Sequence, residues 1–420
     1  MRFKAVKGTN DVLPAESSRW QYVESVIRRQ AERFGFKEIR TPIFEETALF
    51  VKGTGDTTDI VQKEMYTFID KGQRSITLRP EGTPPVMRAL LEHSLLKENP
   101  LAKVYYLAPM FRYERPQAGR LRQHTQFGAE IVGSAAPQAD VEVIALLFFT
   151  LQELGLAGLK LRLNTLGCPK CRPVYREKLV EYLKPKLPDL CEYCNDRFFR
   201  NPLRVLDCKI DQHKFDDAPE MGQFLCAECK EHFQSVQDNL KVIGIPFALD
   251  KKLVRGLDYY TRTAFEVVSE HLGAQDALGG GGRYDGLVEE LGGDPTPGVG
   301  FGSGIERYLL AMKNQGVNFP EGKRVDIFIA TMGQEARLKG MEICSHLRQK
   351  GYLCEQELLD RSLKAQLREA GKLNVRYVAL IGEDEIKKGM VTLKDMDQHE
   401  QKEVSFAELV DNMPQYCKCE

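Results

Sequence analysis

The sequence has few of the features that mark secreted, membrane-bound or strongly charged proteins. It holds one tryptophan in 420 residues, and its formal net charge is −1, because 59 basic residues nearly balance 60 acidic ones. No global basic field indicates a nucleic-acid partner, so any RNA-binding surface must be a local patch. With 42% hydrophobic and 28% charged residues, the composition is that of an ordinary water-soluble protein.

Long apolar segments are absent as well. No apolar run approaches the roughly 20 residues that a membrane-spanning helix needs, and the opening segment MRFKAVKGTNDVLP has no apolar stretch of the secretion-signal type. The longest apolar stretch, residues 141–151, contains Glu142 and is typical of a buried helix. Eleven cysteines without a secretion signal favour a reducing compartment. We therefore expect a cytoplasmic protein that does not bind a membrane.

The hydrophobic periodicity predicts a mixed fold with an antiparallel sheet. Apolar residues at helical spacing predict an amphipathic helix over 14–34 and a long buried helix over 137–154. Strands are expected where apolar and β-branched residues alternate, at 35–41, 75–79, 103–108, 125–132, 158–165 and 253–268. Because strands outnumber crossover helices, the pattern favours the α+β type, an antiparallel sheet flanked by helices, over a doubly wound parallel sheet.

Changes in composition and in hydrophobic pattern divide the chain into four segments. Residues 167–245 contain seven of the eleven cysteines among short charged helices and prolines. This composition indicates a small domain inserted into a larger one that is formed by residues 1–166 and 246–322. From 323 to 420, strand and helix patterns alternate, which predicts a separate C-terminal α/β domain.

An arginine-rich segment, MFRYERPQAGRLRQHTQFGAE at 110–130, carries the strongest chemical signal. Its charged residues surround a Pro-Gln-Ala-Gly turn between two strand-like stretches; they are Arg112, Glu114, Arg115, Arg120 and Arg122. Arginine is rarely buried unpaired, and its planar fork binds phosphates and carboxylates in a bidentate manner. From the residues alone, an anion site and a solvated hairpin with scattered ion pairs both remain open.

Two further segments suggest a ligand site. In VGFGSGIERYLLAM at 299–312, glycines precede a helix whose first turn holds Glu306 and Arg307. Such glycines either let a backbone approach a phosphate or allow close packing of strand on helix. In RGLDYYTRTAFE at 255–266, Arg255, Tyr259 and Tyr260 suit a small zwitterion, with a guanidinium for its carboxylate and phenols for its polar side chain. Ordinary packing of tyrosines is the alternative.

Taken together, these segments resemble the histidyl-tRNA synthetases, a family of class IIa aminoacyl-tRNA synthetases. The hairpin at 110–130 resembles their motif 2, GFGSGIER their motif 3, and GFKEIRTPIFE with Pro42 their motif 1. LVRGLDYYTRTAFEV and ALGGGGRYDGL are similar to the two signatures peculiar to the family, and KGTNDVLP and RPEGT at 79–83 also match. The resemblance runs through nearly the whole chain and is weakest across the cysteine-rich insertion.

The resemblance implies a histidine–tRNA ligase. Such an enzyme activates L-histidine with ATP and Mg²⁺ to histidyl-adenylate plus pyrophosphate, and then transfers histidine to the 3′ end of its tRNA. It implies a homodimer with motif 1 at the interface, an insertion that touches the acceptor arm and a C-terminal anticodon-binding domain. The alternative is a non-catalytic, synthetase-like regulatory subunit of histidine biosynthesis. Those proteins generally lack the C-terminal domain and erode RGLDYY, and this chain has both. A pure RNA-binding protein would leave the ATP and amino-acid motifs without a purpose.

The resemblance also implies roles for individual residues. Arg112 would bridge the ATP α-phosphate and the histidine carboxylate, Arg307 would grip the γ-phosphate, and Arg255 would act on the carboxylate and α-phosphate during adenylation. These three arginines are the expected catalytic residues. Fixed positive charge suits in-line displacement at phosphorus better than a proton-transfer group does. The expected ATP-binding residues are Arg112, Glu114, Arg120, His124 and Arg307.

For histidine, Glu81, Thr83 and Gln126 would receive the α-amino group, Glu130 and Tyr260 would read the two imidazole nitrogens, and Tyr259 and Tyr284 would line the pocket. The full expected set is Glu81, Gly82, Thr83, Arg112, Gln126, Glu130, Arg255, Tyr259, Tyr260 and Tyr284. His124 departs from the family, which usually has an aromatic residue, most often Phe, stacked on adenine at this position. We expect ATP binding to be retained but weaker or pH-sensitive.

The cysteines suggest a structural metal. Cys168-x₂-Cys171, nineteen residues and Cys191-x₂-Cys194 fit the spacing of a four-thiolate zinc site. A third pair, Cys226-x₂-Cys229, and the lone Cys208 leave the ligand choice ambiguous. The alternative is a module of reduced thiols that folds without metal. The resemblance does not decide between them, because zinc is not a general feature of the family.

A row of basic residues marks the C-terminal domain. Arg361, Lys364, Arg368 and Lys372 recur at spacings of three, four and four, which places them on one face of the helix expected over 361–371. Such a row is usually a solvated face. The resemblance to an anticodon-binding domain makes it a candidate contact for tRNA phosphates.

Overall fold

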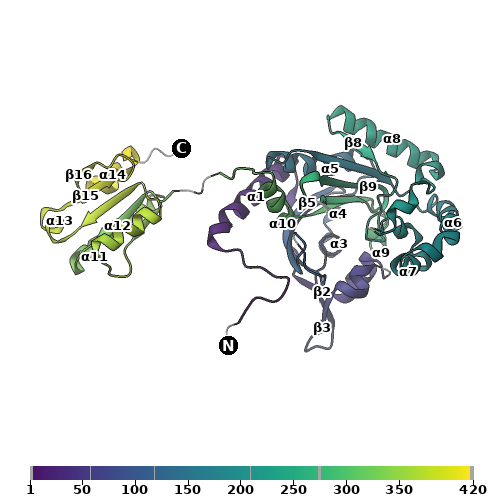
Figure 1. Cartoon of the computed structure of the whole chain (residues 1–420), viewed down its shortest axis with the longest axis horizontal. Coiled ribbons are helices and arrows are strands. Elements are labelled where there is room, and N and C mark those ends of the chain that lie inside the picture. The colour runs from purple at the N-terminus through teal and green to yellow at the C-terminus, as the bar shows by residue number, and fades with distance from the viewer. Residues whose placement is uncertain are drawn as a thin grey trace. The chain divides into compact units, whose positions relative to one another are not determined.

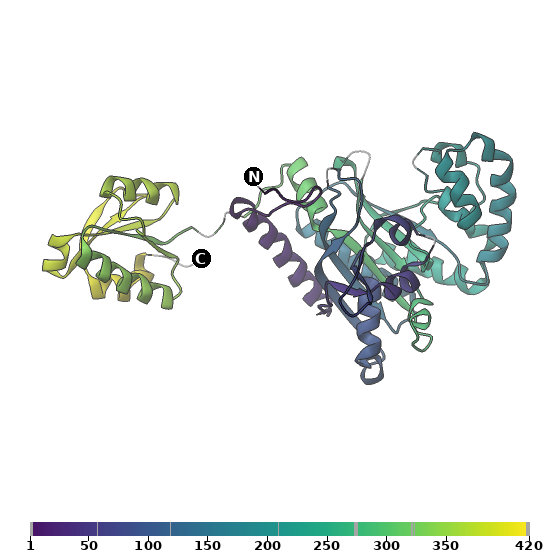
Figure 2. The ribbon, with the colours of Figure 1, turned by 90° about the horizontal axis from the view of Figure 1, so that it is seen from below.

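The computed structural model describes residues 3–56, 58–117, 119–208, 210–272, 276–320, 322 and 324–416. Contacts divide the chain into two compact units, Met1–Phe319 and Pro320–Glu420. Each unit is a sheet covered by helices (Figures 1 and 2). Within the described residues, no helix is both long enough and apolar enough to cross a membrane.

The larger unit is built on an eight-stranded sheet in the order β1-β5-β6-β11-β10-β9-β7-β8. Neighbouring strands from β5 to β7 are antiparallel, and the two edge pairs, β1 with β5 and β7 with β8, are parallel. The expected antiparallel sheet flanked by helices is confirmed. The strands are β1 (Lys37–Glu38), β5 (Ala102–Phe111), β6 (Gln123–Val132), β7 (Leu159–Thr165), β8 (Phe247–Leu249), β9 (Thr261–Ser269), β10 (Ala277–Arg283) and β11 (Gly298–Gly304).

The two faces of this sheet pack against different helices. Because side chains alternate along a strand, Tyr105 of β5 lies in the core formed with α1 (Pro14–Arg33), α5 (Pro137–Glu153) and α10 (Ile305–Asn314). Its neighbour Tyr106 lies in a second core with α3 (Thr83–Glu92) and α9 (Leu287–Glu290). Helix α5 is apolar on most of its surface because α1 and α8 (Ala227–Val242) also pack against it.

One ion pair lies inside the larger unit. Arg283 of β10 and Asp140 of α5 are both fully buried, and the guanidinium binds the carboxylate in a bidentate manner, with Nε 3.1 Å from Oδ2. His232 of α8 lies 3.5 Å from the same carboxylate. Buried charges need such partners, so this cluster fixes the strand that carries ALGGGGRYDGL to two helices behind the sheet.

A second sheet supports the segment RPEGT. It has the antiparallel order β2-β4-β3, with β2 (Phe44–Glu46), β3 (Tyr66–Ile69) and β4 (Ser75–Leu78), and α2 (Thr47–Thr54) follows β2 along the chain. Arg79, directly after β4, is buried and donates hydrogen bonds to the carbonyls of Pro109 and Thr41, each at 2.8 Å. These bonds fix the start of α3 against both β5 and the segment around Pro42.

The segment between β7 and β8 forms a helical module around its own core. Its α-helices are α6 (Arg172–Leu183), α7 (Glu192–Arg200) and α8, and short 3₁₀ turns lie at 184–189, 202–205, 212–215 and 221–224. Tyr175, Leu179, Phe198 and Phe215 pack in its centre. In Figure 2 the module stands at one end of the sheet.

The smaller unit is a five-stranded sheet in the order β13-β12-β14-β15-β16, parallel in its first three strands and antiparallel in its last. Strand β12 is buried on both faces, because Ile327 and Ile329 face one core and Phe328 and Ala330 face another. This arrangement confirms the expected C-terminal α/β domain. Its elements are β12 (Ile327–Thr331), β13 (Cys354–Gln356), β14 (Tyr377–Ile381), β15 (Met390–Asp395), β16 (Gln401–Ser405), α11 (Gln334–Gln349), α12 (Leu363–Lys372), α13 (Glu383–Lys388) and α14 (Phe406–Tyr416).

Two sequence-based expectations about these elements were wrong. The strand expected over 253–268 begins only at Thr261, and the preceding residues form turns and irregular backbone. In a strand, adjacent side chains would face opposite sides, whereas Tyr259 and Tyr260 line the same cavity. In the smaller unit, Arg361 lies before α12 and is bound to Glu357 and Glu369, so it is not part of the helical row.

Candidate active site

A cavity of about 700 Å³ gathers most of the residues that the sequence singled out. The hairpin between β5 and β6, the start of α3, the loop before β9 and the start of α10 all contribute to its wall. The expected site residues that line it are Glu81, Thr83, Arg112, Glu114, Arg120, His124, Gln126, Arg255, Tyr259, Tyr260 and Arg307. Gly82, Glu130 and Tyr284 are not among the lining residues.

The floor of the cavity is made of glycines in β10 and β11. A Cβ atom on Gly280 would lie 2.6 Å from Arg255 Nη1, and one on Gly302 would lie 2.0 Å from Gln126 Nε2. These distances are far below van der Waals contact. The glycine runs in ALGGGGRYDGL and VGFGSG therefore give site side chains room to lie flat on the sheet. Side chains of the site, and not a helix, lie over Gly280 and Gly302.

The hairpin brings several charges together at one end of the cavity. Arg120 forms an ion pair with the buried Glu114, and Arg112 Nη1 lies 3.9 Å from the same carboxylate. Arg112 is oriented by a hydrogen bond of 2.8 Å from its Nε to the carbonyl of Pro80. Burial and the charge of Arg120 lower the pKa of Arg307. This concentration of positive charge favours a polyanion.

Arg255 lies over the floor of the cavity. Its Nη1 donates to Glu266 Oε1 at 3.0 Å, and its guanidinium carbon is 6.0 Å from the centre of the Tyr260 ring. The opposite oxygen of Glu266 is 3.8 Å from Arg162. Glu266, which the sequence analysis did not single out, therefore holds Arg255 in place. The signal for it in the sequence is a carboxylate among the apolar residues of AFEVV at 264–268.

A network of hydroxyls and carboxylates forms the inner end of the site. Glu81 accepts hydrogen bonds from Thr54 Oγ1 at 2.9 Å and from Tyr259 Oη at 3.0 Å. Burial raises the pKa of Glu81, opposed by Arg112 and by these two hydroxyls. Such a carboxylate suits an ammonium group, which would restore its charged form.

Glu130 lies behind this wall and is fully buried. It accepts hydrogen bonds from Thr83 at 2.8 Å, from Tyr284 at 2.5 Å and from Tyr106 at 3.4 Å. Burial, aided by the negative charge of Glu81 and opposed by the hydroxyls, raises its pKa to about 8. Glu130 and Tyr284 bind each other and do not line the cavity.

Tyr106 is a second residue of the site that the sequence analysis did not single out. Its hydroxyl links Glu130 to Gln126, which donates to it at 3.4 Å. A Cβ on Gly82 or Gly128 would lie 2.3 or 2.2 Å from its ring. Those two glycines were a usable signal, because each marks a place where a large side chain approaches the backbone.

His124 and Glu306 have strongly shifted pKa values. Burial, followed by the charges of Arg112 and Arg120, lowers the pKa of His124 to about 3. This lowered pKa favours the neutral form of the His124 imidazole near pH 7. Burial raises the pKa of Glu306 to about 7, and its carboxylate accepts the backbone N–H of Thr125 at 2.7 Å, which fixes α10 to β6.

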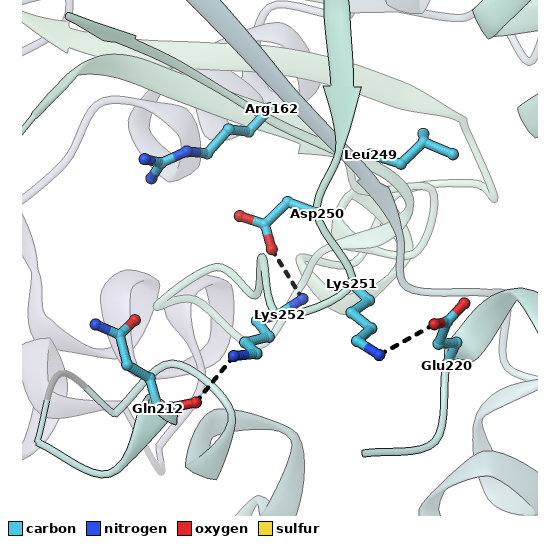
Figure 3. Close-up of a pocket in the computed structure, with 7 residues that line it drawn as sticks. All are labelled: Arg162, Gln212, Glu220, Leu249, Asp250, Lys251 and Lys252. Carbon is cyan, nitrogen blue, oxygen red and sulfur yellow. Dashed lines mark hydrogen bonds and ion pairs between the residues drawn. The ribbon is translucent and has the colours of Figure 1, made fainter. Parts of the chain in front are cut away.

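A second hollow of about 590 Å³ lies where β7 and β8 meet the helical module (Figure 3). It shares Arg162 and Gln212 with the main cavity. Its lysines form ion pairs, Lys251 with Glu220 at 3.1 Å and Lys252 with Asp216, and Lys252 also donates to the carbonyl of Gln212 at 3.0 Å. These pairs neutralise the charge that would attract an anion.

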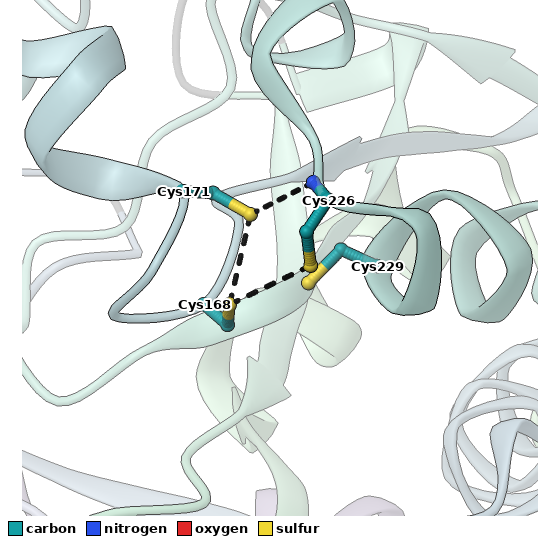
Figure 4. Close-up of side chains that lie close together, drawn as sticks. All are labelled: Cys168, Cys171, Cys226 and Cys229. Carbon is teal, nitrogen blue, oxygen red and sulfur yellow. Dashed lines mark hydrogen bonds between the residues drawn. The ribbon is translucent and has the colours of Figure 1, made fainter.

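The expected zinc ligand set was wrong. Cys168, Cys171, Cys191 and Cys194 do not come together. Cys168 and Cys171 lie with Cys226 and Cys229, as Figure 4 shows. The other pair lies with Cys208 and Asp211. The spacing of adjacent pairs misled the analysis because it does not show which pairs the fold brings together.

Comparisons with known proteins match this architecture along its length. The family model described as histidyl-tRNA synthetase matches residues 8–307, and the model described as anticodon binding domain matches residues 326–416. The chain belongs to the histidyl-tRNA synthetase family. Among its curated relatives, the histidine–tRNA ligase of Desulforamulus reducens is 50% identical over 96% of this chain and 97% of its own. That of Thermoanaerobacter pseudethanolicus is 51% identical over 97% of this chain and 98% of its own.

Solved structures give the same family. The apo histidyl-tRNA synthetase of S. aureus is 37% identical, with a TM-score of 0.84 over 98% of this chain and 100% of its own. A Bacillus halodurans protein, described as an ATP phosphoribosyltransferase regulatory subunit/histidyl-tRNA synthetase, shares only the fold, at 21% identity and a TM-score of 0.65 over 91% of this chain and 99% of its own. The segments of this chain that resemble motifs 2 and 3 and both histidine signatures all contribute residues to the lining of the cavity.

Proposed function

We propose that this protein is a histidine–tRNA ligase. It forms histidyl-adenylate and pyrophosphate from L-histidine and ATP, and it then transfers histidine to the 3′ end of its tRNA. The observation that carries this proposal is that one cavity joins a cationic end, with Arg112 and Arg307, to an inner end with Glu81 and Tyr259. Arg255 lines the same cavity, as a group acting on both substrates must.

The cationic end suits ATP. We assign Arg112 to the α-phosphate and the histidine carboxylate, and Arg307 to the γ-phosphate. Glu114, held by Arg120, receives the adenine edge, and the neutral imidazole of His124 stacks on the base. Mg²⁺ enters with ATP as the counter-ion of its phosphates and is part of that substrate. Arg255 stabilises the charge that develops at the α-phosphate during adenylation.

The inner end suits histidine. Glu81, Thr83 and Gln126 bind the α-amino group, with Gly82 leaving room for Tyr106. Tyr260 and Glu130 read the two imidazole nitrogens, with Glu130 exchanging a hydroxyl partner for the ring. Tyr259 and Tyr284 complete the pocket. A lookalike without both nitrogens would leave buried polar groups unpaired, and this penalty is a strong source of selectivity.

Transfer RNA binds two further parts of the chain in this proposal. The C-terminal unit contacts the anticodon, and exposed Lys364, Arg368 and Lys372 on α12 are its candidate phosphate contacts. The insertion, residues 167–245, touches the acceptor arm. In the same proposal, residues 1–166 and 246–322 form the catalytic domain, and residues 323–420 form the anticodon-binding domain.

We further propose that the protein acts as a homodimer in the cytoplasm. A hollow of about 990 Å³ is lined by the segment around Pro42, including Ile39 and Thr41, and by Leu95. Next to it, Ile43 and Phe44 expose apolar side chains. Exposed apolar groups on one surface favour contact with a second copy. The nine described cysteines are free, which suits a reducing compartment.

Histidine-dependent pyrophosphate exchange with ATP tests the catalytic assignment. Purified protein should exchange pyrophosphate when histidine is present and not when it is replaced by another amino acid. No exchange with histidine would favour a regulatory subunit of histidine biosynthesis. That alternative is disfavoured by the close identity to curated histidine–tRNA ligases and by the presence of the C-terminal domain.

A further inference from the structure

The insertion contains four pairs of polar residues with the same spacing. Three are Cys-x₂-Cys pairs, which begin at Cys168, Cys191 and Cys226, and the fourth is Cys208-x₂-Asp211. The fold nests them. The outermost pairs, 168/171 and 226/229, meet in one cluster, and the two inner pairs, 191/194 and 208/211, meet in another. In the inner cluster, Asp211 occupies the position that a second cysteine has in the other pairs.

The outer cluster has the geometry of a four-thiolate site. Cys168 Sγ lies 3.6 Å from Cys171 Sγ and 3.9 Å from Cys226 Sγ, as the dashed lines in Figure 4 show. A tetrahedron with zinc–sulfur bonds of roughly 2.3 Å has edges of about 3.8 Å. A disulfide would need roughly 2.05 Å. All four ligand atoms lie within 4.8 Å of one another.

Backbone groups around the outer cluster point at sulfur. The N–H of Cys226 donates to Cys171 Sγ at 3.1 Å. The N–H groups of Lys170 and Cys171 interact with Cys168 Sγ. Such donors stabilise the thiolate form, which is the form that binds metal. The cluster has little apolar material of its own, because its buried members are cysteines packed against Leu225.

The inner cluster repeats this arrangement with one oxygen. Cys191 Sγ lies 3.6 Å from Cys208 Sγ, and Cys208 Sγ lies 4.0 Å from Asp211 Oδ2. Asp211 is 2% exposed, and its other oxygen, Oδ1, is 2.8 Å from Lys214 Nζ. Oδ2 also accepts the N–H of Cys191 at 2.8 Å, so Asp211 is paired, and the observation that points to a metal ion is that three sulfurs gather around this carboxylate. Lys214, outside the cluster, offsets part of the negative charge of the three thiolates and the carboxylate.

We propose that the insertion is a two-zinc module with nested sites. The outer zinc is bound by Cys168, Cys171, Cys226 and Cys229. The inner zinc is bound by Cys191, Cys194, Cys208 and Asp211. Zinc is the cation that tetrahedral sulfur-rich ligand sets of this kind prefer. The outer ion joins the end of β7 to the start of α8, the two ends of the module. The inner ion joins the start of α7 to the segment that carries Cys208 and Asp211.

Metal analysis of the full-length protein tests the count. Protein purified under reducing conditions should contain two zinc ions per chain by elemental analysis. Cys226→Ser and Cys208→Ser should each remove one, and the double variant should remove both. Cys344→Ser is the matched control, because Cys344 is a buried thiol in the other unit and belongs to neither cluster. Asp211→Cys should retain two zinc ions, whereas Asp211→Ala should lose the inner one.

A measurement on the unaltered chain guards against variants that fail to fold. Titration with a mercurial should release two zinc ions as the eleven thiols of the chain react, seven of which belong to the insertion. X-ray absorption should give about 3.5 sulfur and 0.5 oxygen ligands per zinc at bond lengths near those of protein zinc sites. Protein free of zinc, with thiols that react without metal release, would overturn the proposal, as would iron in place of zinc. One zinc per chain would overturn the inner site.

Discussion

Replacing Arg255 with alanine should slow adenylation far more than it weakens histidine binding. Arg255 lines the cavity, and its charge is partly offset by Glu266 at 3.0 Å. A full charge about 4 Å from a phosphate, at an effective dielectric of about 20, contributes about 4 kcal/mol. The carboxylate reduces this value, so we expect kcat to fall by roughly 10²-fold to 10³-fold, as for the loss of other preorganised donors.

Arg162→Ala is the matched control. Arg162 lines the same cavity and lies on the other side of Glu266, at 3.8 Å, and it also binds Asp276 at 2.6 Å. Like Arg255→Ala, this variant removes one guanidinium from the neighbourhood of Glu266, but Arg162 is more exposed than Arg255. We therefore expect kcat to change by less than about tenfold. Histidine-dependent pyrophosphate exchange gives kcat and KM for both variants, and thermal unfolding checks that each folds. An effect of Arg255→Ala on KM alone, or an equal loss of kcat in both variants, would refute the assignment.

Three more outcomes follow from the structure. Charge reversal of Lys364 and Arg368 should raise the KM for tRNA and lower its salt dependence by about one unit of slope per lost phosphate contact. Pyrophosphate exchange should not change. Unaltered tRNA kinetics would mean that the row is solvated surface. Glu130 has a pKa of about 8 in the folded chain, against roughly 4.3 when unfolded, so the folded state binds more protons and stability falls as pH rises between these values. Glu130→Gln should flatten that slope in chemical denaturation, and an unchanged slope would contradict the protonation of Glu130. Asp140→Asn should cost about 3 kcal/mol of stability, because it removes the buried partner of Arg283 and leaves it only Asp285, which is partly exposed. A loss below about 1 kcal/mol would contradict this role.

The periodic parts of the fold could be predicted from the sequence. Helices α1 and α5 begin within a residue of their expected starts, because apolar spacing reports directly which face is buried. Strands β10 and β11 were not predicted as strands, because glycine disfavours a strand unless another side chain needs the space. That need comes from Arg255 and Gln126, which are distant in sequence from the glycines beneath them.

Partnerships between distant residues were the hardest to predict. Which cysteine pairs meet depends on the path of the chain through α6 and α7, and the spacing of the cysteines in the sequence does not predict it. Asp211 was overlooked because a carboxylate does not belong to the usual cysteine pattern. Arg361 fits helical spacing with Lys364, yet Glu357 draws it into an ion pair before the helix begins.

The glycine floor limits how the specificity of this site can change. A methyl group at Gly300 would lie 1.6 Å from Glu130 Oε2, and one at Gly302 would displace Gln126. Glu130 therefore occupies the space next to Gly300, and Gln126 occupies the space next to Gly302. A larger residue at either glycine would push that side chain into the space of the ligand. Variation in the amino acid accepted must enter through the walls, at the loop before β9 and the start of α3. Laboratory evolution of an altered specificity should accumulate changes in those two segments and leave Gly300 and Gly302 untouched.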